Sequence, residues 1–427
     1  MTQLATNFPA YTEHDPAVPV WCVTPTLNGC IHRFFDSSPF SPSGRYMGLF
    51  RLPVETRMPR PEEAGEVVVV DLEEGSERVV ATTHGWEPQL GANVQWGADD
   101  HTLIFNDVDL ATHRPHGVRL DWTTGEAHRL EGTVYHVSPD GLRAVSSSLD
   151  RARRTQSGYG VTLADEHTPR NIGAPDDDGL WLTDLTTGRR ELILSLRDAV
   201  RFTPSIPEDD LDNWQVYGFH SKFNPQGDRL IFTVRAFPGE APRPFDLIGA
   251  QGPRGGLEFN VLTLRPDGSE VRNAVPAEHW RNGGHHINWF PDGERLSMNL
   301  GIDGREKGMF FVACGVDGSD LKPIMRSVPG SGHPTIHRDG RHILTDAYAR
   351  EPVAYGDGSV PLRLVDRQTG EDRHIVRIMI EPGELPQRAM RVDPHPAWDR
   401  DWRRVAFNGF ADGTRRVYVA DLGELVG

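Results

Sequence analysis

Cysteine and long apolar runs are scarce in this sequence. Its three cysteines, Cys22, Cys30 and Cys314, occur singly without any C-x-x-C pair, which argues against a disulfide framework and a cluster of thiolate metal ligands. No apolar run approaches the roughly 20 residues that a membrane-spanning helix needs. The segment from Met1 to Tyr11 has no basic stretch followed by an apolar core. We therefore expect no secretory signal and a cytoplasmic location.

Positive charge is also in short supply. The 427 residues include 45 Lys and Arg against 61 Asp and Glu, a formal net charge of −16. Nucleic acids and anionic membranes need a basic surface, so neither is expected as a partner, whereas a small acidic substrate responds to the local field of its pocket. The chain has no P-loop or dinucleotide fingerprint. Gly330-Ser331-Gly332 lacks the G-x-S-x-G spacing of a serine hydrolase.

Turn-forming residues are abundant instead, with 44 Gly and 33 Pro. Many of them belong to a repeat: an aromatic or aliphatic anchor, three residues, a Gly or its substitute, and a short apolar strand. The four clearest copies are FSPSGRYMGLF from Phe40, VSPDGLRAVSS from Val137, FNPQGDRLIFTV from Phe223 and WFPDGERLSMNL from Trp289. Three weaker copies begin at Trp96, Ile336 and Trp398. The P-D-G sequence is typical of a hairpin turn.

A second hairpin follows most copies, with a strand, Asp, two or three residues, Gly and another strand. Examples are VVVVDLEEG (67–75), LDWTTGE (120–126), LWLTDLTTG (180–188) and LRLVDRQTG (362–370). Two hairpins make one propeller blade, so the sequence predicts an all-β fold, a seven-bladed β-propeller of four-stranded antiparallel blades. We expect an N-terminal arm at 1–17 and one propeller domain at 18–427. The segment Val18 to Pro25 should pair beside Arg416 to Leu422, complete blade seven and close the ring.

Alignment of the seven anchors gives each residue a phase, and equal phase means equivalent positions in the blades. The position three residues before the anchor holds Ser37, Asn93, Val134, His220, His286, His333 and His395. Histidine thus fills it in four consecutive blades. Because the first strand of a blade lines the channel and runs toward the turn, these histidines are expected to gather at one mouth of the channel.

Converging imidazoles would repel one another if protonated, whereas neutral imidazoles can share a cation. Imidazole with one carboxylate suits Mn²⁺, Fe²⁺, Zn²⁺ or Ni²⁺ and not Ca²⁺. Asp393, two residues before His395, is the best-placed carboxylate, and an Asx turn is its alternative reading. Isolated histidines are instead expected to be satisfied core residues. This expectation applies to His101, His136 and His342.

Two connections between the hairpins of a blade are unusually long, Leu149 to Asp178 in blade three and Ala236 to Gly256 in blade four. They should emerge on the face that carries the histidines. The first contains cationic side chains and a tyrosine that can lean over the mouth, namely Arg151, Arg153, Arg154 and Tyr159.

Five segments spread over nearly the whole chain resemble the oligogalacturonate lyases, seven-bladed propellers that use a Mn²⁺-type metal. They are CIHRFFDSSPFSPSG (30–44), NWQVYGFHSKFNP (213–225), GHHINWFPDG (284–293), GSGHPTIHRDG (330–340) and DPHPAWD (393–399). The third is similar to the family's T-H-E-F-W-x-P-D-G, and the last to its H-P-H-P.

The resemblance implies roles for the histidines. It implies metal ligands at His286, His333 and His395, with Asp393 in place of a family histidine, and Mn²⁺ ahead of Zn²⁺, Fe²⁺ or Ni²⁺ as the cofactor. It also implies that His220 is catalytic. The family's substrate arginine falls near Gly179 and a glutamine ligand near Met390. These departures, with the Arg-rich loop, indicate a relative that acts on another uronate.

The chemistry that the resemblance implies is β-elimination on an acidic oligosaccharide. The proton α to a uronate carboxylate is removed and the 4-O-glycosidic oxygen leaves, giving a 4,5-unsaturated uronate. A neutral His220 would be the general base, and Arg154 and Tyr159 would bind the carboxylate and protonate the leaving group. Further substrate contacts are expected at His32, Arg33, Asn93 and Arg151.

Two alternatives remain open. One is another metal-dependent sugar enzyme on the same mouth, such as a glycosidase or an epimerase, because the fold alone does not choose the chemistry. The other is a non-catalytic interaction propeller of the TolB or WD type, which predicts no bound metal. The sequence does not predict the oligomeric state.

Overall fold

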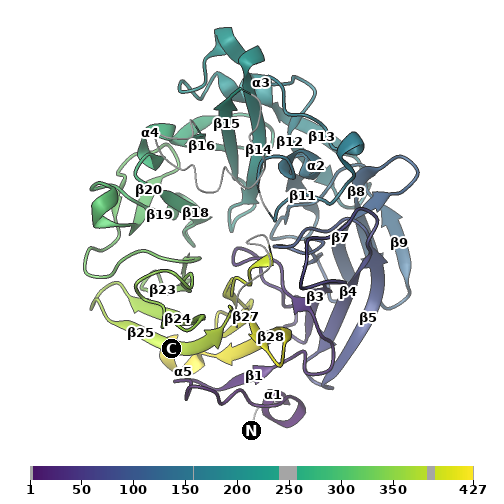
Figure 1. Ribbon diagram of the computed structural model, residues 1–427, viewed down its shortest axis with the longest axis vertical. Coiled ribbons are helices and arrows are strands. Elements are labelled where there is room, and N and C mark those ends of the chain that lie inside the picture. Colours follow the sequence, from purple (N-terminus) through teal and green to yellow (C-terminus); the bar gives the residue numbers. More distant parts are fainter. Residues whose placement is uncertain (1–2, 157, 240–256, 382–389, 427) are drawn as a thin grey trace. The chain divides into compact units, whose positions relative to one another are not determined.

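The fold is the predicted seven-bladed β-propeller, built from seven four-stranded antiparallel sheets. A computed structural model describes residues 3–156, 158–239, 257–381 and 390–426 (Figure 1). Each sheet takes its strands in chain order, except that the last one begins with the N-terminal strand.

The first three blades follow the predicted order of two hairpins each. Blade one contains β2 (Cys30–Ile31), β3 (Tyr46–Arg51), β4 (Gly65–Asp71) and β5 (Ser76–Thr83). Blade two contains β6 (Gln95–Trp96), β7 (Thr102–Asp109), β8 (Arg114–Asp121) and β9 (Glu126–Arg129). Blade three contains β10 (His136–Val137), β11 (Arg143–Ser146), β12 (Gly179–Asp184) and β13 (Arg190–Ser195).

The remaining blades repeat the pattern. Blade four contains β14 (Trp214–Phe223), β15 (Leu230–Pro238), β16 (Glu258–Leu264) and β17 (Arg272–Val275). Blade five contains β18 (Gly284–Trp289), β19 (Arg295–Leu300), β20 (Phe310–Gly315) and β21 (Lys322–Pro323). Blade six contains β22 (Thr335–Ile336), β23 (His342–Thr345), β24 (Ser359–Asp366) and β25 (Asp372–Met379). Blade seven contains β26 (Ala397–Trp398), β27 (Arg404–Ala411), β28 (Thr414–Asp421) and β1 (Val20–Cys22).

Helices are short and lie in the connections. The α-helices are α1 (Gln3–Asn7), α2 (Leu149–Ala152), α3 (Leu196–Val200), α4 (Ala277–Trp280) and α5 (Gly423–Val426). The 3₁₀ helices are η1 (Asp165–His167), η2 (Glu208–Asn213) and η3 (Arg305–Lys307). The first long connection, between β11 and β12, contains α2 and η1. Residues 240–256 of the second lie outside the described residues. Within the described ranges, no helix has the length and apolar character to span a bilayer.

The P-D-G turns form as the residue types predict. In blade three, Gly141 takes a φ of 73°, a left-handed conformation that costs Gly little because it has no Cβ. Its N–H donates to the Ser138 carbonyl at 2.8 Å. The Asp140 carboxylate accepts from the backbone N–H of Leu142 at 3.0 Å. The turn therefore fixes the spacing between the first and second strands of the blade.

The N-terminal strand closes blade seven as predicted. Val20, Trp21 and Cys22 of β1 pair antiparallel with Ala420, Val419 and Tyr418 of β28, and Figure 1 shows purple β1 beside yellow β28. The edge of that blade is thus paired with the other end of the chain, which removes an exposed edge strand.

The chain divides into two compact units. One comprises Met1–Phe105, Leu120–Ala127 and Ser331–Gly427, and the other comprises Asn106–Arg119 and His128–Gly330. Blades six, seven and one lie in the first unit, which we call the terminal unit. Blades three, four and five lie in the second, the central unit. Each unit has its own apolar clusters of buried strand residues.

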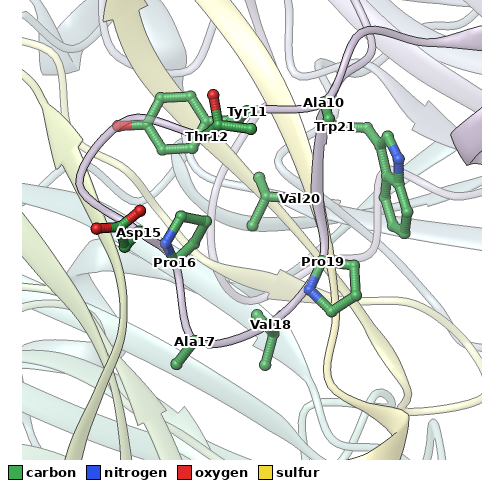
Figure 2. Close-up of a pocket in the computed structure, with 10 residues that line it drawn as sticks. All are labelled: Ala10, Tyr11, Thr12, Asp15, Pro16, Ala17, Val18, Pro19, Val20 and Trp21. Atoms are coloured by element: carbon green, nitrogen blue, oxygen red, sulfur yellow. The ribbon is translucent and has the colours of Figure 1, made fainter.

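The N-terminal arm packs on the terminal unit. The Tyr11 N–H donates to the Val20 carbonyl at 2.8 Å, and the Tyr11 hydroxyl donates to the Arg377 carbonyl at 2.7 Å. The loop from Ala10 to Trp21 surrounds an open cavity of about 490 Å³, into which Figure 2 shows apolar side chains of the loop projecting.

The closure of blade seven gives a stability prediction. The Val20 side chain is 2% exposed in the cluster between blades six and seven. Val20→Ala should lower the free energy of unfolding by about 2 kcal/mol, because it removes buried methyl groups and leaves a cavity. Val79→Ala is the matched control, because Val79 is 41% exposed on a strand. Equal urea-unfolding midpoints for the two variants would contradict a packed closing strand.

Candidate metal centre

The four equivalent histidines lie in or just before the first strands of blades four to seven. His220 lies in β14 and His286 in β18, each within a register shift of the strand. His333 and His395 lie just before β22 and β26. His286 and His395 have positive φ angles of 58° and 49°. Such backbone is uncommon outside glycine and collects at functional sites.

In the terminal unit, the Asp346 carboxylate joins two of these histidines. It is fully buried. Its Oδ1 accepts from the His333 backbone N–H at 2.7 Å and lies 2.9 Å from His333 Nδ1. Its Oδ2 accepts from the His395 backbone N–H at 3.1 Å. Because a carboxylate facing Nδ1 favours the Nδ1–H tautomer, the lone pair of His333 lies on Nε2, as in carboxylate–histidine–metal arrangements.

Gly332 allows this close approach. Its φ is 55°. A Cβ on this residue would lie 2.2 Å from both the carbonyl oxygen and the carboxylate Oδ1 of Asp346. Another residue here would displace Asp346 and with it the His333 ring.

His395 is buried beside His333, with ring centroids 4.4 Å apart at an interplanar angle of 87°. Neither ring nitrogen of His395 has a hydrogen-bond partner within the described ranges. Burial lowers the pKa of His395 well below 6.5, and the neighbouring His333, His32 and Arg391 lower it further. The ring is therefore neutral at pH 7 and carries a lone pair that can bind a cation.

Asp393 supplies the carboxylate predicted from the sequence. Its Oδ2 lies 3.8 Å from His395 Nε2 and accepts from Arg391 Nε at 2.8 Å. One ligand atom each of His333, Asp393 and His395 lies within 4.8 Å of the others. Two imidazole nitrogens and one carboxylate oxygen, all buried, fit a divalent transition metal. We call these three residues the histidine nest.

Three predicted substrate-contact residues lie in the same unit as the histidine nest. The His32 ring lies 6.5 Å from the His395 ring, and its Nε2 lies 3.4 Å from the Pro394 carbonyl. Arg33 Nε donates to the Asn93 side-chain carbonyl at 3.0 Å. All three residues are buried, and Asn93 also has a positive φ of 56°.

Sequence reasoning missed several residues of this site. Asp346, Arg391 and Gly332 hold the ligands, and the Tyr348 ring lies 5.7 Å from the His333 ring. Burial, together with the charge of Asp346, raises the pKa of Glu351 to about 7. Asp346 lies ten residues after its anchor, where blades two, five and seven hold Asn106, Asn299 and Asn408, so an alignment extended beyond the histidine position would have found it. The Ser-Gly-His sequence before β22 was the available signal for Gly332.

In the central unit, His220 lies among aromatic rings. Its ring stacks on Phe219 at 3.9 Å and lies 5.2 Å from the Tyr135 ring. The Tyr159 ring, from the long connection of blade three, lies 6.1 Å away. The structure thus brings together His220 and Tyr159, the predicted base and proton donor. Lys222, two residues later on β14, is buried, and its ammonium donates to the Ile287 carbonyl at 2.6 Å.

His286 pairs with the preceding histidine. The Nδ1 atoms of His285 and His286 lie 2.7 Å apart, so one donates a proton and the other accepts it. This pairing directs the remaining nitrogen of His286, Nε2, away from His285 and leaves it as the potential ligand atom.

Two arginines of the long connection, Arg151 and Arg154, are engaged in local contacts. Arg154 donates to the carbonyls of Asp165, Thr168 and Pro169 at 2.7–3.1 Å. Arg151 pairs with the Asp178 carboxylate at 2.6 Å.

The expectation of a core position was wrong for one isolated histidine. His101 is exposed, because it lies in the blade-two turn, whereas His136 is buried. His342 is half-buried and contacts the Asp339 carboxylate at 2.6 Å.

The fold defines a seven-bladed propeller, and comparison with solved structures supports that class. An oligogalacturonate lyase in complex with manganese superimposes with a TM-score of 0.63 and 17% identity, covering 97% of this chain and 96% of that one. The oligogalacturonate lyase of Vibrio parahaemolyticus gives a TM-score of 0.62 at the same identity and coverage. At this identity the likeness shows the fold alone.

Sequence comparison gives a shorter match. No known protein-family profile matches the chain. An S-adenosylmethionine:tRNA ribosyltransferase-isomerase of Heliobacterium modesticaldum is 28% identical over 143 residues, which are 33% of this chain and 40% of that protein. The chain thus spans well under half the length of this relative.

Burial of His32 gives a pH prediction. Desolvation lowers its pKa from 6.5 to about 4. Below pH 6.5 the unfolded chain therefore binds a proton at His32, whereas the folded chain binds this proton only near pH 4. Stability should therefore fall as the pH falls from 6.5 toward 4, by about 1.4 kcal/mol per pH unit from this residue. Between pH 7 and pH 5, the free energy of unfolding of His32→Gln should fall by about 2 kcal/mol less than that of the parent, as measured by urea unfolding. Identical pH dependence in both proteins would contradict a neutral buried His32.

Proposed function

We propose that this protein is a metal-dependent lyase that cleaves a uronate-containing oligosaccharide by β-elimination. The observation that carries the proposal is the histidine nest, in which His333, Asp393 and His395 offer buried ligand atoms within 4.8 Å of one another. A packed core gains nothing from a neutral imidazole whose two nitrogens lack partners among the described residues, as in His395.

The donor set supports a transition cation, and Mn²⁺ is the first choice because a structural neighbour was solved in complex with manganese. Zn²⁺, Fe²⁺ and Ni²⁺ suit the same ligands. Bound there, the cation would supply positive charge that offsets the uronate carboxylate as its α-carbon loses a proton. The proposal adds His286 to the ligands on the sequence resemblance alone.

His220 and Tyr159 are assigned the proton transfers. A half-buried imidazole among aromatic rings can accept a proton near pH 7. The Tyr159 ring, 6.1 Å from it, would protonate the leaving oxygen. Glu351, with a pKa near 7, is a second candidate base in the terminal unit.

Substrate binding is assigned to polar side chains of the terminal unit. The His32 ring lies 6.5 Å from the His395 ring of the histidine nest, and Arg33 Nε donates to the Asn93 side chain. The sequence also predicts substrate contacts at Arg151 and Arg154. To bind a carboxylate, however, the Arg154 guanidinium would have to give up its hydrogen bonds to the carbonyls of its own loop. Arg33, held by Asn93 and paired with Asp36 at 2.6 Å, is already oriented.

A metal-affinity measurement tests the nest. His395→Ala should abolish binding of one equivalent of Mn²⁺, because it deletes a ligand. Asp346→Asn should weaken Mn²⁺ binding by about 10–100-fold, because it loosens the tautomer and orientation of His333. Both are measured by equilibrium dialysis of the metal-stripped protein.

The matched control is Asp412→Asn, the same change at an exposed position of blade seven. It should bind Mn²⁺ as the parent does. If Asp346→Asn keeps parental affinity while His395→Ala loses the ion, Asp346 does not position His333. If both variants keep it, the nest is not the metal site.

Product formation tests the reaction and the base. The parent protein should generate ultraviolet absorbance of a 4,5-unsaturated product from at least one member of a panel of oligouronates. His220→Ala should retain bound metal and lose about 10²–10⁴ in rate, because a general base contributes that much without holding the cation. His279→Ala, a half-buried histidine of the same unit, is the control and should be fully active.

The outcomes separate the alternatives. Loss of bound metal in His220→Ala would identify His220 as a metal ligand. Full activity in His220→Ala with loss in Glu351→Gln would move the base to Glu351. Bound metal without absorbance on any uronate would favour another metal-dependent sugar enzyme, and no bound metal would favour an interaction propeller.

A further inference from the structure

A second group of metal-ligating side chains lies in the first turn of blade six, between β22 and β23. The Asp339 Oδ2 atom lies 2.9 Å from His337 Nδ1 and 2.6 Å from His342 Nδ1. One ligand atom of each residue lies within 4.8 Å of the others. We call His337, Asp339 and His342 the turn triad.

The fold does not require these imidazoles. The position of His337, one residue after the anchor, holds Ser41, Gly97, Ser138, Asn224, Phe290 and Asp399 in the other blades. The position of His342 holds Tyr46, Thr102, Arg143, Arg229, Arg295 and Arg404. Six other blades form the turn without either histidine. Blade six alone places two imidazoles beside its turn aspartate.

The hydrogen bonds fix which nitrogen of His337 faces the aspartate as an acceptor. His337 Nε2 lies 3.0 Å from the Trp402 carbonyl, which can only accept, so Nε2 carries a proton. The Asp339 backbone N–H donates to His337 Nδ1 at 3.3 Å, which requires a lone pair on Nδ1. In the neutral ring, this lone pair faces a carboxylate oxygen at 2.9 Å. Two acceptors at that distance repel each other unless a proton or a metal cation lies between them.

The backbone N–H groups of Arg341 and His342 hold the Asp339 carboxylate in place. Its Oδ1 accepts from those two N–H groups at 2.7 and 3.0 Å. Oδ2 is therefore the atom left to the imidazoles.

The surroundings orient the ligands and permit entry. The His337 ring packs against Trp398 and Trp402, with centroids 4.9 and 5.4 Å away. Asp339 is exposed and His342 half-buried. Arg341, in the same turn, pairs with the Asp366 carboxylate, so its charge is offset.

We propose that the turn triad is a binding site for a divalent transition cation of the Zn²⁺ class. His337 Nδ1, His342 Nδ1 and Asp339 Oδ2 would be the ligands, and water would complete a tetrahedron. Zn²⁺ binds imidazole at about 2.0–2.1 Å and carboxylate at about 2.0–2.2 Å, which places ligand atoms about 3.3 Å apart. The observed separations of 2.9 and 2.6 Å require only a small rotation of the aspartate. The site is separate from the histidine nest and does not depend on lyase activity.

Equilibrium dialysis of the metal-stripped, full-length protein against Zn²⁺, with bound metal counted by elemental analysis, tests the proposal. His342→Arg should bind one equivalent less than the parent. Arg occupies this position in blades three, four, five and seven, so the variant should keep the parental Tm. Asp339→Asn, which keeps an oxygen for the turn, should also lose that equivalent.

The same loss should follow when His342→Arg is added to His395→Ala, because the two sites are independent. His14→Asn, an exposed histidine of the N-terminal arm, is the control and should bind as the parent does. Parental Zn²⁺ stoichiometry in folded His342→Arg and Asp339→Asn would overturn the proposal and identify the triad as a protonated histidine–aspartate pair.

Discussion

The Asp346 carboxylate is the contact on which the candidate site depends. It is fully buried and receives the backbone N–H groups of His333 and His395 together with the His333 ring. A buried carboxylate is costly unless such donors satisfy it. Asp346 therefore links the strand starts of blades six and seven and at the same time sets the tautomer of a potential ligand.

The remaining features of the histidine nest follow from this carboxylate. Gly332 must be a glycine because Asp346 approaches so closely. His395 must be neutral because it is buried beside a second histidine and Arg391, which lower its pKa. Asp393 stays beside it through the bond from Arg391. A neutral imidazole, an oriented imidazole and a paired carboxylate form a site in which a bound cation would satisfy the ring nitrogens of His395.

The turn periodicity predicted the fold because each blade repeats its local chemistry. Gly141 and Asp140 form their turn from neighbouring residues alone, and closure by Val20 to Cys22 followed from a missing strand. The histidine phases placed the four histidines in or just before the first strands of their blades for the same reason. Asp346 was missed because the prediction used only the position three residues before each anchor, whereas Asp346 lies ten residues after its anchor. Arg391 was missed because it lies in a connection whose length differs between blades. The roles of Arg151 and Arg154 depend on loop carbonyls that no sequence pattern marks. The turn triad was within reach, because comparison of the two turn positions among blades would have found it.

Anomalous diffraction from crystals grown with Mn²⁺ tests the central claim most directly. The account predicts a peak at the manganese edge about 2.0–2.3 Å from a nitrogen of His395 and from His333 Nε2, with an Asp393 oxygen beside it. The Asp346 carboxylate should remain on His333 Nδ1. A fully occupied manganese elsewhere, with the histidine nest holding only hydrogen-bonded water, would contradict it.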